Sequence, residues 1–487
     1  MQSEPLQATK NPAPAASQQQ LTPFELLMLL DERPGYPMCF YVETSLVGSL
    51  NHPQLKAALA LAAQRHPRMR SRVDHGPNGW QWVLTEVEPP LIVMSEDHSA
   101  RQIAFCPFRL QREPGIRVLL FEEAADRFSL VLQVHHSVCD GIAALEFLGD
   151  VWSIYEGGEP PRLRPGVIRS RRDSLAPSPP AKGADNQASA SWTFASFLPA
   201  KLATSNRKQP AAASERPYQT TRLSRQETRA VQAAAAVLGT AVNDLTVAAA
   251  MRSICRWNSH KGRPAKAVRI NMPVSLRPPG CREPATNRIG YAFLDRTAAA
   301  CDSAVALAQS LAVASRWIQS TGAAEMFLEV LHQLARWPWL LRLLTRLPLS
   351  LSTAVVSNVG NIQARMRTQA PTRAGLVRPG SLTITSVVGV PPVRPGTALA
   401  VGVTSYAGEL AVTTMADPAE FSDLDNASLG EMIAAELRSF IEVSKLQRGQ
   451  VPTDPIYSGL SESDQTSDSK DEASLTGRAG DVRLVEG

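Results

Sequence analysis

The segment FSLVLQVHHSVCDGIAALEFL, residues 128–148, changes its hydrophobic period at its centre. In FSLVLQV the large apolar side chains recur at every second position, which predicts a β-strand. After SVCDG they recur at helical spacing, as far as the Gly157–Gly158 pair that is expected to end the helix. His135 and His136 are therefore predicted to lie at the end of a strand, before a tight turn and a helix.

Adjacent histidines at such a turn allow several roles. The simplest is a pair that only packs in the turn. A metal site would need further ligands, and the other histidines form no HxH or HxxxH cluster, so no metal site is predicted. Cys139 with a histidine as its base would be a nucleophile, but a lone cysteine beside a histidine is a weak pattern. The remaining role is general base catalysis by an imidazole, whose pKa lies near neutral.

A general base at this turn would take a proton from a hydroxyl, amine or thiol as that group attacks an acyl carbonyl. Asp140 would shape the turn by holding the backbone or an arginine, and would not touch the substrate. Gly141 would let the backbone approach closely, so that an amide faces a developing oxyanion. The pattern favours acyl chemistry and leaves the purely structural pair open.

The composition is that of a globular protein, with 44% hydrophobic and 20% charged residues in a chain of 487. The sequence contains no uninterrupted apolar run of about 18 or more residues, so no membrane-spanning helix is predicted. The first 20 residues do not resemble a secretory signal. The six cysteines form no CxxC pair, and together these features predict reduced thiols and a cytoplasmic protein.

The net charge of +5 is unevenly distributed. Residues 451–487 hold three Lys or Arg against eight Asp or Glu, whereas basic residues gather in RLRPGVIRSRR, residues 162–172. This basic segment is either a solvated stretch or a site for an anionic lipid surface, a carrier protein or a phosphorylated cofactor. Nucleic-acid binding is not expected, because no recognition motif accompanies the charge.

The pattern of composition divides the chain into two lobes. Residues 1–20 and the acidic tail 451–487 are predicted to be disordered, and the Pro-, Ala- and Ser-rich residues 163–216 to be a linker. Residues 21–162 form the N-terminal lobe, where Asn51 is expected to cap a helix, and residues 217–450 form the C-terminal lobe, which opens with the capping box of Ser224 and Glu227. Both halves alternate strands and helices, which predicts an α/β fold.

The stretch RWPWLLRLLTRLPLSL, residues 336–351, allows two interpretations. It packs inside the second lobe, or it presents an amphipathic face to lipid. The second interpretation adds a peripheral membrane contact to the candidate interactions of the protein.

HHSVCDG resembles the HHxxxDG signature of the condensation-domain and CoA-dependent acyltransferase superfamily. Further segments are similar to family motifs and occur in family order over roughly residues 21–445. They are LTPFE (21–25), HPRMRSR (66–72), PFRLQREPGIRVLLF (107–121), VNDLTVAA (242–249), PVSLRPPG (273–280), NRIG (287–290) and SNVGN (357–361). The motifs are most similar to the wax ester synthase/diacylglycerol acyltransferase branch and to stand-alone condensation-like proteins. The chain departs from many members in having no DFGWG-like motif.

The resemblance implies a role for each motif residue. His136 is the catalytic base, His135 supports the turn, and Gly141 completes the motif. Asp140 is the structural carboxylate, and Arg277 is the candidate for its arginine partner. In SNVGN, Ser357 and Asn358 are the candidates for lining the channel.

The resemblance further implies two chloramphenicol-acetyltransferase-like lobes with a central cleft or tunnel. An acyl group would pass from a thioester, on CoA or on the phosphopantetheine of an acyl carrier protein, to an alcohol or amine acceptor, with no metal and no bound cofactor. A catalytically silent scaffold that binds a carrier protein or a small molecule is the alternative.

Overall fold

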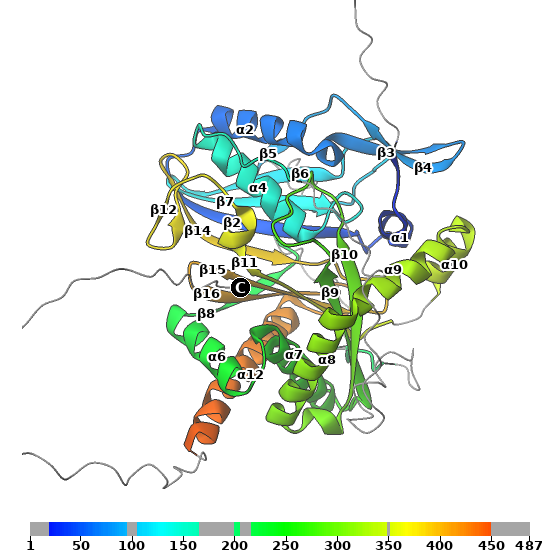
Figure 1. Cartoon of the computed structure of the whole chain (residues 1–487), viewed down its shortest axis with the longest axis vertical. Helices are drawn as coiled ribbons and strands as arrows, with labels where there is room; N and C mark the ends of the chain where they lie inside the picture. Colours follow the sequence, from blue (N-terminus) through cyan, green and yellow to red (C-terminus); the bar gives the residue numbers. More distant parts are fainter. Residues whose placement is uncertain (1–18, 95–104, 165–198, 205–215, 348–350, 450–487) are drawn as a thin grey trace, which may run out of the picture.

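The computed structural model describes residues 19–94, 105–164, 199–204, 216–347 and 351–449. The ranges predicted to be disordered lie almost wholly outside them, as does most of the predicted linker. Gln19 and Gln20 are an exception, because they form the short strand β1 by backbone pairing with Trp82 and Gln81. The described residues form two large mixed β-sheets with helices packed on them, so the chain is an α/β protein (Figure 1).

The first sheet has five strands in the order β14-β2-β7-β6-β5. Their bounds are Leu382–Val390 (β14), Cys39–Gly48 (β2), Arg127–His135 (β7), Ile116–Ala124 (β6) and Leu91–Met94 (β5). Helices α2 (His52–Arg65) and α4 (Gly141–Tyr155) share one hydrophobic core with this sheet. As predicted, Asn51 caps α2, because its Oδ1 accepts the backbone N–H of Gln54 at 3.0 Å.

The second sheet has six strands in the order β10-β9-β11-β15-β16-β8. Their bounds are Ile289–Thr297 (β10), Ala267–Ser275 (β9), Ala354–Asn361 (β11), Leu399–Tyr406 (β15), Glu409–Ala416 (β16) and Gln219–Leu223 (β8). Its core is completed by α6 (Arg225–Val237), α7 (Val242–His260), α8 (Ala304–Thr321) and α12 (Asp423–Gly449). The predicted capping box of Ser224 and Glu227 begins α6.

Smaller elements surround the two sheets. A hairpin of β3 (Ser71–Gly76) and β4 (Gly79–Leu84) pairs with β1, and β12 (Thr372–Arg373) pairs with β13 (Leu376–Val377). Two short 3₁₀ turns span Pro67–Arg70 and Ala299–Cys301. The remaining helices are α1 (Pro23–Asp31), α9 (Ala323–Leu334), α10 (Pro338–Arg346) and α11 (Ile362–Met366).

Within the described ranges no single helix is both long and apolar enough to cross a bilayer. Helices α6 and α7 meet both criteria only when taken together, as a pair bent by 99°.

One strand joins the two halves of the chain. Residues 217–450 are expected to form a single lobe, but β14 from this range pairs antiparallel with β2 at the edge of the first sheet. Where β14 passes β15 of the second sheet, the two backbones meet at Gly389 and Gly402. A Cβ atom on Gly402 would stand 1.8 Å from the Gly389 carbonyl oxygen, so only glycine fits at this crossing.

Replacing Gly402 by alanine is expected to lower the free energy of unfolding by about 1–3 kcal/mol, because the added methyl group forces the β14 and β15 backbones apart. Denaturant unfolding followed by circular dichroism measures the change. Gly158→Ala is the control, since a Cβ there meets its nearest atom, the Ser153 carbonyl oxygen, only at 3.4 Å. Equal stability of the two variants would show that the crossing is loose.

Candidate active site

The histidine turn has the predicted form. Strand β7 ends at His135, and α4 begins at Gly141. The His136 backbone N–H donates to the Met38 carbonyl at 2.7 Å, and the Val138 N–H donates to the His135 carbonyl at 2.9 Å. These bonds fix the directions in which the two imidazoles leave the chain.

The His136 ring is held mainly by apolar contacts. It meets the edges of Phe24 and Phe40, at centroid distances of 5.7 and 5.3 Å, and only 8% of the residue is exposed. Its Nδ1 is buried without a hydrogen-bond partner. Burial lowers the pKa of His136 below its ordinary 6.5, although the Asp140 charge opposes this effect. The imidazole is therefore neutral at neutral pH and able to accept a proton.

His135 has different surroundings. Its Nδ1 accepts the Ser137 backbone N–H at 3.1 Å, so its Nε2–H donates to the Glu32 carboxylate at 2.8 Å. Both ring nitrogens are thus engaged in holding the turn. Cys139, considered above as a nucleophile, is also buried, and burial raises the pKa of its thiol well above the ordinary value. A thiolate at Cys139 is disfavoured for this reason.

Asp140 connects three parts of the molecule. Its Oδ1 accepts the Ala143 backbone N–H at 3.1 Å and so caps α4. Its Oδ2 accepts the Arg288 backbone N–H at 2.7 Å and forms a salt bridge with Arg277 Nη1 at 2.8 Å. The carboxylate is 2% exposed and does not line the cavity beside His136.

The loop between β9 and β10 carries the groups that meet the histidine turn. Arg277 reaches Asp140 from this loop, and its Nη2 donates to the Thr286 carbonyl at 2.9 Å. Asn287 donates its side-chain N–H groups to the His136 and Ser137 carbonyls at 2.8 and 3.0 Å. Asn287 was not among the predicted site residues, although it belongs to the NRIG segment singled out in the sequence.

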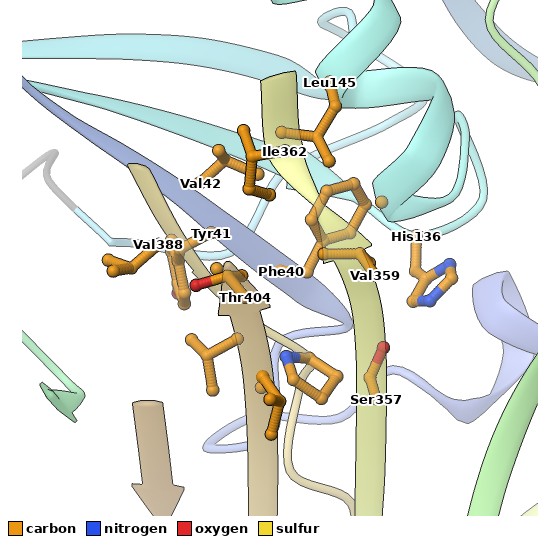
Figure 2. A pocket seen from close by; sticks show the side chains of 16 residues that line it. Phe40, Tyr41, Val42, His136, Leu145, Ser357, Val359, Ile362, Val388 and Thr404 are labelled. Carbon is orange, nitrogen blue, oxygen red and sulfur yellow. The ribbon is translucent and has the colours of Figure 1, made fainter. Parts of the chain in front are cut away.

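A cavity of about 480 Å3, including space open to solvent, lies between the two sheets and the start of α4. Figure 2 shows His136 at one end of the cavity, with Val388 toward the other. The walls are mainly apolar and come from both halves of the chain, including Phe40 and Val42 of β2, Leu145 of α4 and Val359 of β11. This cavity is the expected central cleft between the lobes.

Of the two predicted channel residues, one lines the cavity and the other does not. Ser357 lines the cavity, whereas the Asn358 side chain accepts the Gly360 backbone N–H at 2.9 Å and shapes the bulge of β11. Gly141 lines the cavity too, but a Cβ there would lie 3.7 Å from Val359, an ordinary contact. The backbone does not need glycine at this position, and the missing side chain keeps the space between α4 and β11 open.

Sequence patterns gave no sign of the aromatic side chains around His136. Phe24 lies in the LTPFE segment and Phe40 in β2, but which face of each element meets the histidine is settled only by tertiary packing. Among the described residues, no group of three or more His, Cys, Asp or Glu side chains could hold a metal ion.

Asp140→Ala is expected to lower the free energy of unfolding by about 3–5 kcal/mol, because it leaves the buried Arg277 cation unpaired and uncaps α4. The matched control is Asp74→Ala, whose carboxylate is half exposed and lies 3.8 Å from Arg72, and which should cost less than about 1 kcal/mol. Chemical denaturation of the two variants provides the measurement. A cost for Asp140→Ala no larger than the control would contradict a structural role.

Curated relatives match part of the chain. Gramicidin S synthase 2 of Aneurinibacillus migulanus is 32% identical over 124 residues, which is 24% of this chain and 3% of that protein. Tyrocidine synthase 3 of Brevibacillus parabrevis is 30% identical over 146 residues, or 28% of this chain and 2% of that protein. The chain thus corresponds to a small part of each of these relatives.

Solved structures match almost the whole chain. The first condensation domain of the CDA synthetase has a TM-score of 0.62 at 16% identity, covering 88% of this chain and 97% of that one. Polyketide synthase associated protein 5 from Mycobacterium tuberculosis gives 0.58 at 17%, with coverages of 88% and 98%. A variant of the starter condensation domain of rhizomide synthetase, in complex with C8-CoA, gives 0.54 at 18%, with coverages of 88% and 94%.

These likenesses confirm the predicted fold class of two chloramphenicol-acetyltransferase-like lobes, whose sheets are mixed and do not close into a barrel. A family model described as "Condensation domain" matches residues 16–289, more than half of the chain and all of the histidine turn. The resemblance to the wax ester synthase branch stays a prediction. The chain belongs to the condensation-domain family.

Proposed function

We propose that the protein transfers an acyl group from a thioester to an alcohol or amine, with His136 as the general base. The observation that carries this proposal is a buried imidazole at the end of an apolar cavity, with one ring nitrogen unpaired and with its pKa lowered by burial. A buried polar atom without a partner costs free energy, so its presence in a folded protein calls for a functional reason. A base that must bind a proton during the reaction provides that reason.

The reaction proceeds in two steps. The acceptor oxygen or nitrogen attacks the thioester carbonyl carbon while His136 takes its proton, which gives a tetrahedral intermediate and an imidazolium. The intermediate then collapses, the carbon–sulfur bond breaks, and the imidazolium returns the proton to the departing sulfur. The Asp140 charge favours the imidazolium without contacting the substrate, since the carboxylate is engaged by Arg277 and two backbone amides.

The apolar walls suit the reaction. A cavity lined by Phe40, Val42 and Leu145 excludes water, which protects the thioester from hydrolysis and strengthens the electrostatic interactions within the site. Ser357 of β11 is among the hydroxyl-bearing residues of the cavity wall, and in this proposal it orients a polar group of the substrate (Figure 2).

CoA and a carrier-protein phosphopantetheine are both candidate donors. Family membership supports an acyl or peptidyl transfer, and one solved structure of the same fold holds C8-CoA. Another variant of that starter condensation domain holds both C8-CoA and Leu-SNAC, which supports a thioester donor and an amine acceptor. An alcohol acceptor, a cytoplasmic location and the absence of a bound cofactor stay predictions from the sequence.

His136→Ala is expected to reduce acyl transfer about 10²–10⁴-fold, because it removes the general base. The assay incubates the protein with mixed acyl-CoAs and with alcohols or amines, follows thioester consumption and identifies products by mass spectrometry. His260→Ala is the matched control, since His260 is exposed at the end of α7.

Two further results complete that test. His135→Ala should lower the melting temperature, because His135 bonds to Glu32 and to the Ser137 amide. It should reduce the rate of acyl transfer less than His136→Ala does. A His136→Ala protein that keeps near-wild-type turnover would contradict the general-base role. It would favour a catalytically silent scaffold that only binds a carrier protein or small molecule.

The pH dependence of kcat/KM follows from the lowered pKa of His136. The base is active when neutral, so the rate should fall as the pH drops through the pKa, with a midpoint below 6.5. Initial rates between pH 4.5 and 8, with circular dichroism to verify folding at each pH, give the profile. A midpoint above 7 would contradict burial as the dominant influence on the imidazole.

A further inference from the structure

A second, larger hollow lies outside the cavity beside His136. It is enclosed by α1, α9, α10 and β10 and has a volume of about 1540 Å3, including space open to solvent. In Figure 1 these elements lie together at one side of the molecule. The lining is mostly aliphatic and aromatic, with Leu27, Phe293, Val330, Leu334 and Leu347 among its residues. Ligand sites in proteins are typically lined in this way, by aliphatic and aromatic side chains with a few polar groups.

The rim of the hollow is formed by an unusual helix. In α10 only Leu341 is buried, while Trp337 and Trp339 at its start are 52% and 67% exposed. Val330 of α9 is 58% exposed, and Leu344 is exposed as well. Among the described residues of the stretch 336–351, only Leu341 is buried, so the first interpretation, packing inside the lobe, holds for Leu341 and not for the two tryptophans. A contiguous exposed apolar surface of this kind marks a binding site.

A layer of aromatic rings separates the hollow from His136. Tyr291 lines the hollow and packs on Phe327, at a centroid distance of 5.0 Å. The Tyr291 ring also meets Phe24 at 5.5 Å, and Phe24 meets His136 at 5.7 Å. The Phe24 and Tyr291 side chains thus stand between the hollow and the candidate base.

The charged groups of the lining lie toward the opposite end of α1. Leu27 and Asp31 line the hollow one helical turn apart, and Asp31 pairs with Arg394. Arg33, whose Nε is buried without a hydrogen-bond partner, follows the helix. From Phe24 to Asp31 the helix α1 advances about 10 Å. An extended alkyl chain covers that distance in roughly nine carbon–carbon bonds.

We propose that this hollow binds the unbranched aliphatic chain of a substrate, whose reactive end passes Phe24 and Tyr291 to reach His136. The inference rests on the acyl transfer proposed above and names its substrate class: a molecule with about eight or more methylene groups and a single reactive end. The chain belongs either to the acyl donor or to the acceptor, and the chemistry of the hollow is the same for both.

Three features favour an aliphatic chain over a bilayer or a second protein. The site is concave, its lining is mostly aliphatic and aromatic, and Tyr291 of that lining contacts the Phe24 ring that in turn contacts His136. A flat membrane contact or a subunit interface would not need a concave site whose lining contacts the aromatic neighbour of the base.

The test measures binding by isothermal titration calorimetry of the full-length protein. One arm uses alkyl-CoA thioethers, which cannot react, with chains of two to twelve carbons. The other arm uses alkan-1-ols of four to ten carbons. If the donor carries the aliphatic chain, the affinity for the alkyl-CoA thioethers should depend on chain length; if the acceptor carries it, the affinity for the alkan-1-ols should. In that arm the affinity should rise about three- to fourfold per methylene group up to roughly nine carbon–carbon bonds and then level off.

Variants locate the binding site. Val330→Glu and Leu344→Glu place a charge on the wall of the hollow and should weaken binding of the ten-carbon probe at least tenfold, leaving the shortest probes unchanged. Val313→Glu is the matched control, because Val313 is 45% exposed on α8 and does not line the hollow. Circular dichroism melts verify that each variant is folded.

A probe affinity that does not depend on chain length in either arm would overturn the proposal. The same dependence of affinity on chain length in Val330→Glu as in the wild type would also overturn it, because the aliphatic chain would then bind elsewhere. A dimer, or binding to phosphatidylcholine–phosphatidylglycerol vesicles, that Val330→Glu abolishes without changing probe affinity would assign the hollow to a protein partner or a membrane. Binding with the expected dependence but without acyl transfer would leave the hollow assigned and the proposed reaction wrong.

Discussion

The buried carboxylate of Asp140 is the contact on which the geometry of the site depends. It fixes the start of α4, the Arg288 backbone and the Arg277 side chain, so it ties the histidine turn to the loop between β9 and β10. Removing a carboxylate from water costs several kcal/mol, which only a full set of donors offsets. A second buried carboxylate acts in parallel: Asp150 of α4 is bound by His66 and by Arg282 of the same loop. Burial raises the pKa of Asp150, but these donors outweigh it and leave the pKa below its ordinary value.

The two adjacent histidines show how environment divides chemistry between identical side chains. His135 is bonded at both ring nitrogens and has no lone pair to offer. His136 lies between two phenylalanine rings, and its neutral form is favoured by burial. The site combines an apolar pocket, which keeps the base unprotonated, with a carboxylate held at a distance, which limits the cost of protonating it. A carboxylate bonded directly to the imidazole would favour the charged form before any substrate arrived.

Local features of this structure were predictable from the sequence, and long-range ones were not. The strand, turn and helix of residues 128–148, the Asn51 cap and the Ser224 capping box depend on spacing within a few residues, and all were predicted. The resemblance to a family supplied the pairing of Asp140 with Arg277, which are 137 residues apart. The sheet partner of β14, the contacts of Asn287 and the exposed face of α10 are set by tertiary packing, to which hydrophobic periodicity is blind.

The position of β14 also has a consequence for the order in which the protein is made. The first sheet receives its edge strand only after Val390 has been synthesised, about 250 residues after β7. At roughly 5–20 residues per second, the backbone groups of β2 on that side wait on the order of 10–50 seconds for their partner. During this interval the nascent first half exposes an unpaired strand edge, which is a site for aggregation or for chaperone capture. A single strand thus makes completion of the first half of the protein depend on synthesis of the second.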